Sequence, residues 1–163
     1  MKHMIATLFF GFLLANATSV AALSETNKKQ AYEGHYWNEE KDGIFKLQLT
    51  GDGIEGITVW GTKPQNDIHN PDPNKRDRTL KGIKFLWGFT YDHKKNRWKG
   101  GKVYDPNTGK TYDAKMSLEN SGQTLKMRGY IGMAMFGRTA KFERVTVQDW
   151  PLSLSSTSQN TDR

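Results

Sequence analysis

Aromatic residues on successive β-patterned runs carry the clearest chemical potential in this sequence. As interior filler they would form an ordinary packed core. Around a partly open interior they would instead line an apolar pocket with a few polar tips, which is how sites for small ligands are built. The sequence leaves both alternatives open. These residues are Trp60, Trp87, Phe89, Tyr91, Trp98, Tyr104 and Tyr112.

Arginines supply candidate cationic contacts for such a ligand. Alternation along Leu125, Met127 and Ile131 places Arg128 and Tyr130 on the opposite face of one strand. If the apolar face looks inward, which is the usual arrangement, Arg128 lies at the surface. If it looks outward to a covering segment, the guanidinium lines the interior and binds a carboxylate or phosphate. The arginines in or beside the most patterned segments are Arg78, Arg128, Arg138 and Arg144.

The segment GYIGMAMFG, from Gly129 to Gly137, combines glycines with apolar residues. It is not a dinucleotide-binding motif, because no helical pattern follows it. Its glycines, including Gly132, indicate a bend, a bulge or a close strand approach. Met133 to Phe136 would form an adaptable apolar lip at a cavity mouth. The predicted ligand-binding residues are therefore Trp87, Phe89, Tyr91, Trp98, Tyr104, Tyr112, Arg128, Tyr130, Met133, Phe136 and Arg138.

Metal and cofactor chemistry has little support in the sequence. The absence of cysteine excludes disulfides and thiolate metal sites. His35, His69 and His93 lack the helical spacing of metal ligands. The turn that begins at Asp105 lacks the glycine and the acid that a calcium loop requires. We therefore expect no metal and no cofactor.

Catalysis is left undecided, and the sequence favours a protein that is not an enzyme. No serine lies in a nucleophile elbow. Asp92, Asp105 and Asp113 sit beside turns, where Asp commonly bonds its own backbone. Asp67 and His69, on a long polar segment, could act together as a catalytic base. A hydrolase is therefore only the third functional alternative.

Period-2 alternation, rather than helical periodicity, positions these residues. Tight turns join most of the alternating runs. About eight short strands result, which predicts an all-β fold: a single antiparallel up-and-down barrel. Such a barrel holds one small ligand or fills with side chains. The expected strands lie within 33–37, 45–49, 54–60, 83–91, 97–104, 112–118, 125–131 and 138–147.

One long loop, Gly61 to Lys81, interrupts the strand pattern with 21 mostly polar residues. A loop of this length in a compact domain is functional, a lid or disordered. Its Asn70-Pro71-Asp72-Pro73 sequence is stiff, which limits the entropy lost on ordering. We expect the loop to fold over one end of the barrel, with Arg78 held by a carboxylate or by carbonyl groups.

The two ends of the chain have the composition of a signal peptide and a tail. Lys2 and His3 precede an apolar run, Ile5 to Leu14, that is too short to span a bilayer, and Val20-Ala21-Ala22 offers the small residues that a signal peptidase reads. Without a cysteine, lipoprotein anchoring is excluded. The predicted divisions are a signal peptide at 1–22, an N-terminal extension at 23–32, a β-barrel domain at 33–150 and a disordered tail at 151–163.

The formal net charge of +7 indicates a basic surface. Basic residues cluster at 75–78 and 94–97, and they would attract anionic lipid, polysaccharide or nucleic acid non-specifically. Acidic residues are mixed in, and no stacked aromatic ladder accompanies the charge. We therefore expect no specific nucleic acid partner.

Short motifs with a specific order and spacing run through the expected barrel: Gly34-His35-Tyr36, Asn70-Pro71-Asp72-Pro73, Arg78, Leu80-Lys81-Gly82, Trp98-Lys99-Gly100-Gly101, Tyr104-Asp105-Pro106, Gly109-Lys110-Thr111-Tyr112, Leu125-Lys126-Met127-Arg128-Gly129-Tyr130-Ile131-Gly132 and Phe136-Gly137-Arg138-Thr139. In these motifs the chain resembles the bacterial family catalogued as domain of unknown function 2147, whose members look like lipocalin or calycin barrels. The resemblance implies export and a barrel, and it supplies no catalytic residue.

The opening motif departs from the lipocalin-like Gly-x-Trp pattern. Tyr36 stands where that pattern has tryptophan, and Trp37 comes one place late. This departure leaves open how the floor of the barrel is closed.

These observations favour an exported, soluble, lipocalin-like protein, periplasmic or secreted, without a transmembrane segment in its mature chain. Its expected partner is a small apolar or amphipathic ligand in the bacterial cell envelope. The alternative is a non-enzymatic envelope protein that binds anionic lipid or polysaccharide through a basic rim.

Overall fold

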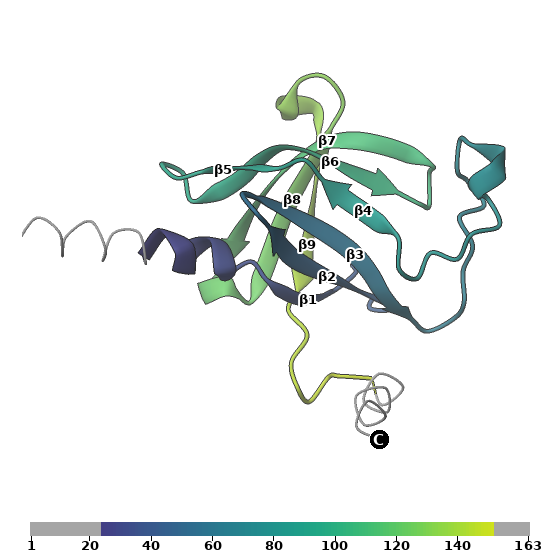
Figure 1. The fold of residues 1–163 in the computed structure, drawn as a ribbon, viewed down its shortest axis with the longest axis horizontal. Coiled ribbons are helices and arrows are strands. Elements are labelled where there is room, and N and C mark those ends of the chain that lie inside the picture. Colours follow the sequence, from purple (N-terminus) through teal and green to yellow (C-terminus); the bar gives the residue numbers. More distant parts are fainter. Residues whose placement is uncertain (1–23, 152–163) are drawn as a thin grey trace, which may run out of the picture.

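The computed structural model describes residues 24–151, so the expected signal peptide and residues 152–163 of the expected tail lie outside the described residues. Antiparallel strands form one sheet that curls into a nearly closed barrel (Figure 1), which confirms the predicted fold class. The strands are β1 (Gly34–Trp37), β2 (Gly43–Thr50), β3 (Gly53–Gly61), β4 (Lys84–Trp87), β5 (Thr90–Asp92), β6 (Arg97–Asp105), β7 (Lys110–Glu119), β8 (Thr124–Tyr130) and β9 (Arg138–Glu143).

The strands pair in chain order, with β5 as a short addition beside β6. Short 3₁₀ turns lie in three connections: η1 (Pro73–Lys75), η2 (Asn120–Gly122) and η3 (Ala134–Phe136). The first and last strands meet through an antiparallel bridge between Tyr36 and Arg144, and the Val145 amide donates to the His35 carbonyl over 2.9 Å. This contact brings the two edges of the sheet together.

The core lies inside the barrel and follows from the alternation of the strands. Leu47, Ile54, Trp98, Met116 and Leu125 are almost completely buried. On β7 and β8 the pairs Met116–Met127 and Leu118–Leu125 share the inner face, while the residues between them face out. Burying this one face of the sheet is the main source of stability.

The run from Ile83 to Tyr91, expected to be one strand with a single apolar face, is divided in two. Gly88 adopts a positive φ of 75° between β4 and β5. The register pairs Leu86 with Val103 and Trp87 with Lys102, so Leu86 takes the inward position and Trp87 the outward one. The expectation of a continuous strand was therefore wrong, because a backbone break changes the side chains that face the core.

The predicted N-terminal extension contains a short helix over residues 24–30, which lies at one end of the barrel (Figure 1). Behind it, the Tyr32 side chain inserts into the core and is 1% exposed. Its hydroxyl donates to the Asn96 carbonyl over 2.9 Å. The Tyr36 hydroxyl donates in turn to the Tyr32 carbonyl, also over 2.9 Å. The helix and Tyr32 thus close this end of the barrel.

Arg144 fastens this closure from the last strand. Its guanidinium donates to the carbonyls of Ala31 and Glu33, each over 2.7 Å, and to that of Gly122 over 2.9 Å. It also donates to the Tyr36 hydroxyl over 2.6 Å and lies over the Tyr36 ring. Tyr36 is completely buried, so it fills the position at which the lipocalin-like pattern has tryptophan.

Candidate ligand-binding site

A row of small residues crosses the inner face of the barrel and ends at a cation. Gly101, Ala114, Gly129 and Arg138 are register partners from β6 to β9. The ring of Phe89 covers the first of them, because a Cβ at Gly101 would lie 2.0 Å from that ring. Ala114 and Gly129 present at most one methyl group to the interior. We call Ala114 and Gly129, together with Arg138 at their end, the small-residue row.

Partly exposed apolar side chains flank the small-residue row. Val103 and Tyr112 form the next cross-strand pair, and both are half-buried. A Cβ at Gly129 would be 3.6 Å from Tyr112 and 3.9 Å from Val103, which is ordinary contact distance. The Arg138 side chain is 79% exposed and donates to Glu39 over 2.8 Å. The arrangement therefore places apolar surface next to a solvent-accessible guanidinium.

Two predicted site residues, Tyr91 and Trp98, pack together at the end of the barrel that the helix closes, and a third, Phe89, belongs to the same buried core. Tyr32 meets Tyr91 and Trp98 edge to face, with ring centroids 6.4 and 6.3 Å apart, and the Tyr91 and Trp98 centroids are 5.0 Å apart. At this end the aromatic residues act as core filler. Among the described residues, the buried Trp98 indole N–H has no hydrogen-bond acceptor.

Trp87 and Tyr104, also predicted as ligand contacts, lie on the outer face of the sheet. A β-bulge between Trp98 and Gly101 shifts the alternation of β6 by one residue. Val103 consequently faces in and Tyr104 faces out, although Tyr104 shares the sequence parity of Trp98. The long loop covers Tyr104, which is 7% exposed.

Arg128 and Tyr130 lie on the outer face as well, because Met127 takes the inward position on β8. The Arg128 guanidinium donates to the carbonyls of Ala134 and Met135, over 2.7 and 3.0 Å, and to the Thr139 hydroxyl over 2.9 Å. The structure thus selects the surface alternative for Arg128. The predicted residues Met133 and Phe136 are exposed on the η3 connection beside it.

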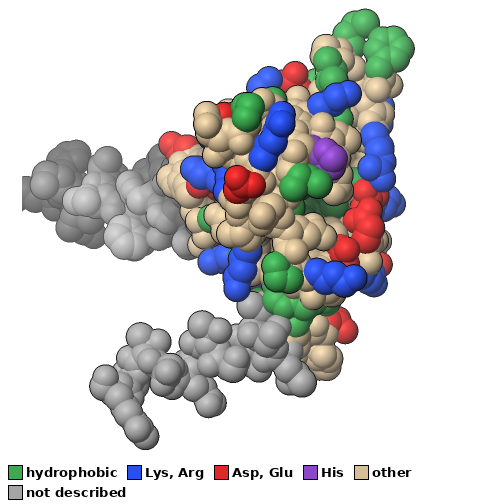
Figure 2. Space-filling view, turned by 90° about the vertical axis from the view of Figure 1, so that its right-hand side faces the viewer, with side chains coloured by type: hydrophobic (Ala, Val, Ile, Leu, Met, Phe, Trp, Pro, Cys, Tyr) green, Lys and Arg blue, Asp and Glu red, His purple; other side chains and the backbone are tan. Residues whose placement is uncertain are grey.

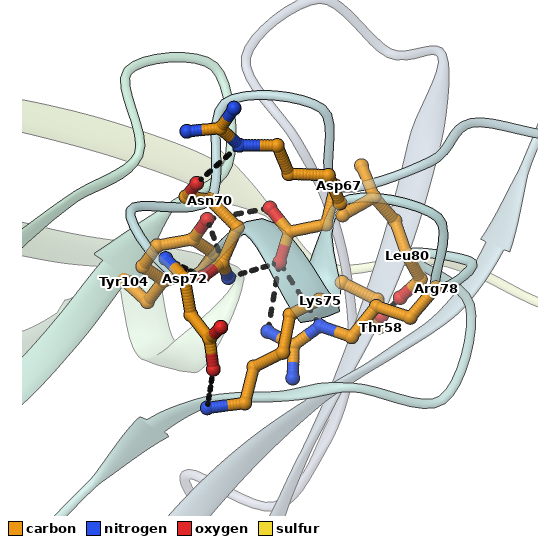
Figure 3. Close-up of polar contacts among 9 residues, drawn as sticks. Thr58, Asp67, Asn70, Asp72, Lys75, Arg78, Leu80 and Tyr104 are labelled. Carbon is orange, nitrogen blue, oxygen red and sulfur yellow. Dashed lines mark hydrogen bonds and ion pairs between the residues drawn. The ribbon is translucent and has the colours of Figure 1, made fainter.

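The long loop is ordered around Asp67, which is completely buried (Figure 3). Asp67 accepts a hydrogen bond from the Tyr104 hydroxyl, one from Asn70 over 2.6 Å, and two from Arg78 over 3.0 and 2.7 Å. The prediction that a carboxylate or carbonyl groups hold Arg78 is therefore confirmed, and the group is the carboxylate of Asp67. At the base of the loop, the Thr58 hydroxyl donates to the Leu80 carbonyl.

The hydrogen bonds of this cluster favour an ionised Asp67 beside a protonated Tyr104. Burial raises the pKa of Asp67, but hydrogen bonds from Tyr104, Asn70 and Arg78 outweigh it and hold that pKa below its usual range. Burial, and then the bond to Asp67, raises the pKa of Tyr104 to about 12. Both oxygens of the Asp67 carboxylate already accept hydrogen bonds. The carboxylate therefore serves as a structural anchor rather than as a free base.

The loop packs against the outer face of β6 and the turn between β6 and β7. Gly109, with a φ of 68°, lies directly beneath the loop, and a Cβ there would be 1.9 Å from the His69 carbonyl oxygen. The glycine of this turn is therefore required both by backbone conformation and by the close approach of the loop. The contact through His69 is made by its backbone, which gives no support to a catalytic base formed by Asp67 and His69.

A second candidate site is an open depression on the outer face, with a volume of about 490 Å³. It lies between the β5–β6 hairpin and the η3 connection. Among the predicted ligand-binding residues, Tyr130 belongs to it. The sequence did not bring the other lining residues together, because their proximity depends on register across β5, β6, β7 and β8. We call it the outer depression; its lining residues are Thr90, Arg97, Lys99, Gly100, Lys115, Tyr130 and Ala134.

Metal ligands and membrane-spanning helices are absent from residues 24–151. No group of three or more His, Asp or Glu side chains in this range could hold a metal ion. None of its helices has the length and apolar character to cross a membrane.

The antiparallel strand order and the nearly closed barrel define a lipocalin-like β-barrel. The fold is similar to a solved structure of protein HP1028 from Helicobacter pylori, described as belonging to the lipocalin family. The TM-score is 0.64 at 24% sequence identity, and the match covers 72% of this chain and 85% of that chain. Residues 34–144 match the family described as an uncharacterized protein conserved in bacteria (DUF2147), and the chain belongs to that family. No curated protein matches the sequence.

Proposed function

We propose that this protein is an exported carrier or sensor that binds a small amphipathic anion, such as a fatty acid, inside its barrel. The observation that carries the proposal is the small-residue row, in which Ala114 and Gly129 present little side-chain volume on the inner face and Arg138 follows as the next register partner. An apolar tail gains free energy from burial against Val103 and Tyr112. The carboxylate of the ligand accepts two hydrogen bonds from one guanidinium.

The existing partner of Arg138 does not prevent this role. The Arg138–Glu39 pair is exposed on the arginine side, and exposed ion pairs contribute little to stability. A ligand carboxylate can therefore replace Glu39 at small cost. The similarity of the fold to a lipocalin supports a small-ligand site, while the chemistry of the ligand is inferred from the residues of the row.

Titration with cis-parinaric acid, a fluorescent fatty acid, tests the proposal. Gly129→Val should weaken binding at least tenfold, because the new side chain occupies the row while its Cβ has ordinary contact distances. Arg138→Gln should weaken binding of the acid but not of the neutral alcohol of equal chain length. The matched control is Tyr130→Ala. It removes an aromatic side chain at the position next to Gly129, on the outer face of the same strand.

The protein used should begin at residue 23, so that the apolar run at 5–14 cannot bind the probe by itself. Saturable binding that is lost in Gly129→Val and kept in Tyr130→Ala would support a site inside the barrel. Equal loss in both variants, or no binding of any amphipathic probe, would refute it.

A further inference from the structure

The connection between β8 and β9 exposes an unusual concentration of apolar side chains. Four of the six large hydrophobic residues that are exposed in the described part of the chain lie in this one segment. Single exposed apolar residues are normal on a soluble surface, whereas a cluster marks a contact site. We call this group the η3 tip; its members are Ile131 (68% exposed), Met133 (61%), Met135 (71%) and Phe136 (75%).

The η3 tip projects from the barrel wall. Figure 1 shows the segment as a separate loop above β6 and β7, and Figure 2 shows hydrophobic side chains at the end of the same projection, with Lys and Arg side chains below it. The described residues therefore leave these side chains in contact with solvent.

Hydrogen bonds hold the tip in this position. Arg128 binds the carbonyls of Ala134 and Met135 from below. Gly137 packs so closely on β8 that a Cβ would lie 2.2 Å from the Gly129 carbonyl oxygen. The exposure of the apolar side chains is thus built into the fold, and little conformational entropy remains to be lost when they bind.

Cations exceed anions beside the tip. Lys115 and Arg128 are direct cross-strand neighbours, a like-charge pairing that is unfavourable by itself. Arg97 and Lys99 share a single carboxylate, that of Asp92, over 3.5 and 3.4 Å. Among the described residues, Lys115 has no salt-bridge partner.

The positive charge and the apolar tip adjoin the same outer depression. Arg97, Lys99 and Lys115 line it together with Ala134 of η3. A partner that matches both the cations and the apolar tip presents a layer of anionic groups with an apolar layer directly beneath it. An anionic phospholipid bilayer has this arrangement, whereas a polysaccharide offers no apolar layer.

We propose that the η3 tip and the outer depression dock the protein on the surface of an anionic phospholipid membrane. The tip enters the boundary between head groups and acyl chains, and Lys115 with its neighbours faces the phosphates. This surface lies on the outside of the sheet, whereas the ligand of the proposed function would lie inside it. Either proposal can therefore fail without the other.

Vesicle co-sedimentation tests the docking proposal with the chain that begins at residue 23. Vesicles that contain phosphatidylglycerol should bind the protein, and vesicles of phosphatidylcholine alone should bind at least tenfold more weakly. The double substitution Met135→Ser with Phe136→Ser should reduce partitioning at least tenfold. Its matched control, Ile68→Ser with Val147→Ser, removes equally exposed apolar side chains elsewhere and should have no effect.

Charge and folding have their own controls. Lys115→Glu should weaken binding severalfold and reduce its salt dependence, while Lys81→Glu, the same charge change in the long loop, should change binding much less. Phe136→Trp keeps an apolar side chain and should keep binding. Unchanged melting temperatures show that the variants fold.

Four results would overturn the proposal. The first is equal binding to both kinds of vesicle, or to neither. The second is equal loss in the tip variant and in its control. The third is a dimer in sedimentation equilibrium that Phe136→Ser dissociates, which would make the tip a contact between two copies. Tight binding of free glycerol phosphate that abolishes vesicle binding would instead assign the depression to a soluble phosphate.

Discussion

Asp67 shows how a polar residue in a loop becomes part of the core. Its carboxylate lies completely buried within the long loop and accepts hydrogen bonds from Tyr104, Asn70 and Arg78. Asp67→Asn replaces the acceptor of an ion pair with an amide, which leaves Arg78 without its counter-charge. We expect the free energy of unfolding to fall by about 2–4 kcal/mol in urea denaturation. Asp77→Asn, an exposed change in the same loop, should cost less than about 0.5 kcal/mol.

The same cluster predicts an acid dependence. Because the pKa of Asp67 is lower in the folded protein than in the unfolded chain, its contribution is complete above the unfolded pKa of about 3.9. The contribution is lost as the pH falls through the lower folded pKa. The stability difference between the native protein and Asp67→Asn should therefore be constant from pH 5 to 7 and shrink below about pH 4. A difference that stays constant at acid pH would show that Asp67 does not titrate in this way.

Gly132 is a position at which the backbone disfavours a side chain for conformational reasons alone. Its φ is 71°, and no atom lies within 4 Å of a Cβ built there. Gly132→Val should therefore lower stability by about 1–3 kcal/mol through backbone strain and not through a clash. Gly129→Ala is the matched control, because Gly129 has ordinary space and no positive φ, and it should cost less. Equal melting temperatures for Gly132→Val and the native protein would contradict this account.

At the scale of elements, the alternation of apolar and polar residues predicted most strands. It assigned side chains to the wrong face wherever a bulge or a break shifts that alternation by one residue. The bulge in β6 moves Tyr104 to the outer face, and the break at Gly88 does the same to Trp87. A slip of one residue exchanges the two faces of a strand. Such slips depend on cross-strand pairing, which a single sequence does not reveal, so the predicted site mixed residues of the inner and outer faces.

The helix at 24–30 escaped prediction for a different reason. Its seven residues are all polar, and a helix of this length is marginal by itself in water. Its place is determined by contacts made later in the chain, through Tyr32 and through Arg144. Arg78, in contrast, was expected to be held by a carboxylate or by carbonyl groups, and the structure shows the carboxylate of Asp67, eleven residues away in the same loop.

Arg144 joins three elements, and its removal should loosen the closure of the barrel. Arg144→Gln loses most of the bonds to Ala31, Glu33, Gly122 and Tyr36. We expect a cost of about 2–4 kcal/mol and faster amide hydrogen exchange over residues 31–36 than elsewhere. Arg138→Gln, which removes one exposed ion pair, should leave exchange in this segment unchanged. A uniform rise in exchange across all strands would instead indicate global destabilisation without a local role.

At the scale of the whole molecule, the two proposed sites divide the barrel between an inner and an outer function. The inner row ends at Arg138, and the outer depression lies across β6, β7 and β8 on the opposite face of the same sheet. A single sheet can serve both because successive residues face opposite sides. Docking by the outer face would hold the inner site close to a source of amphipathic ligands, which is a consistent arrangement for a carrier.

The proposed function includes export, and the start of the mature chain tests that part of the proposal. The apolar run at 5–14 and the small residues before Leu23 predict cleavage after Ala22. Cleavage there leaves the helix at 24–30 intact, with Glu25 in its first turn bonded to Lys28 and His93. The end of the barrel that this helix closes is therefore preserved. The intact mass of protein recovered from the producing cells should correspond to a chain that begins at Leu23 and carries no lipid. Retention of residues 1–22, or the added mass of an acyl chain, would contradict export of a free barrel.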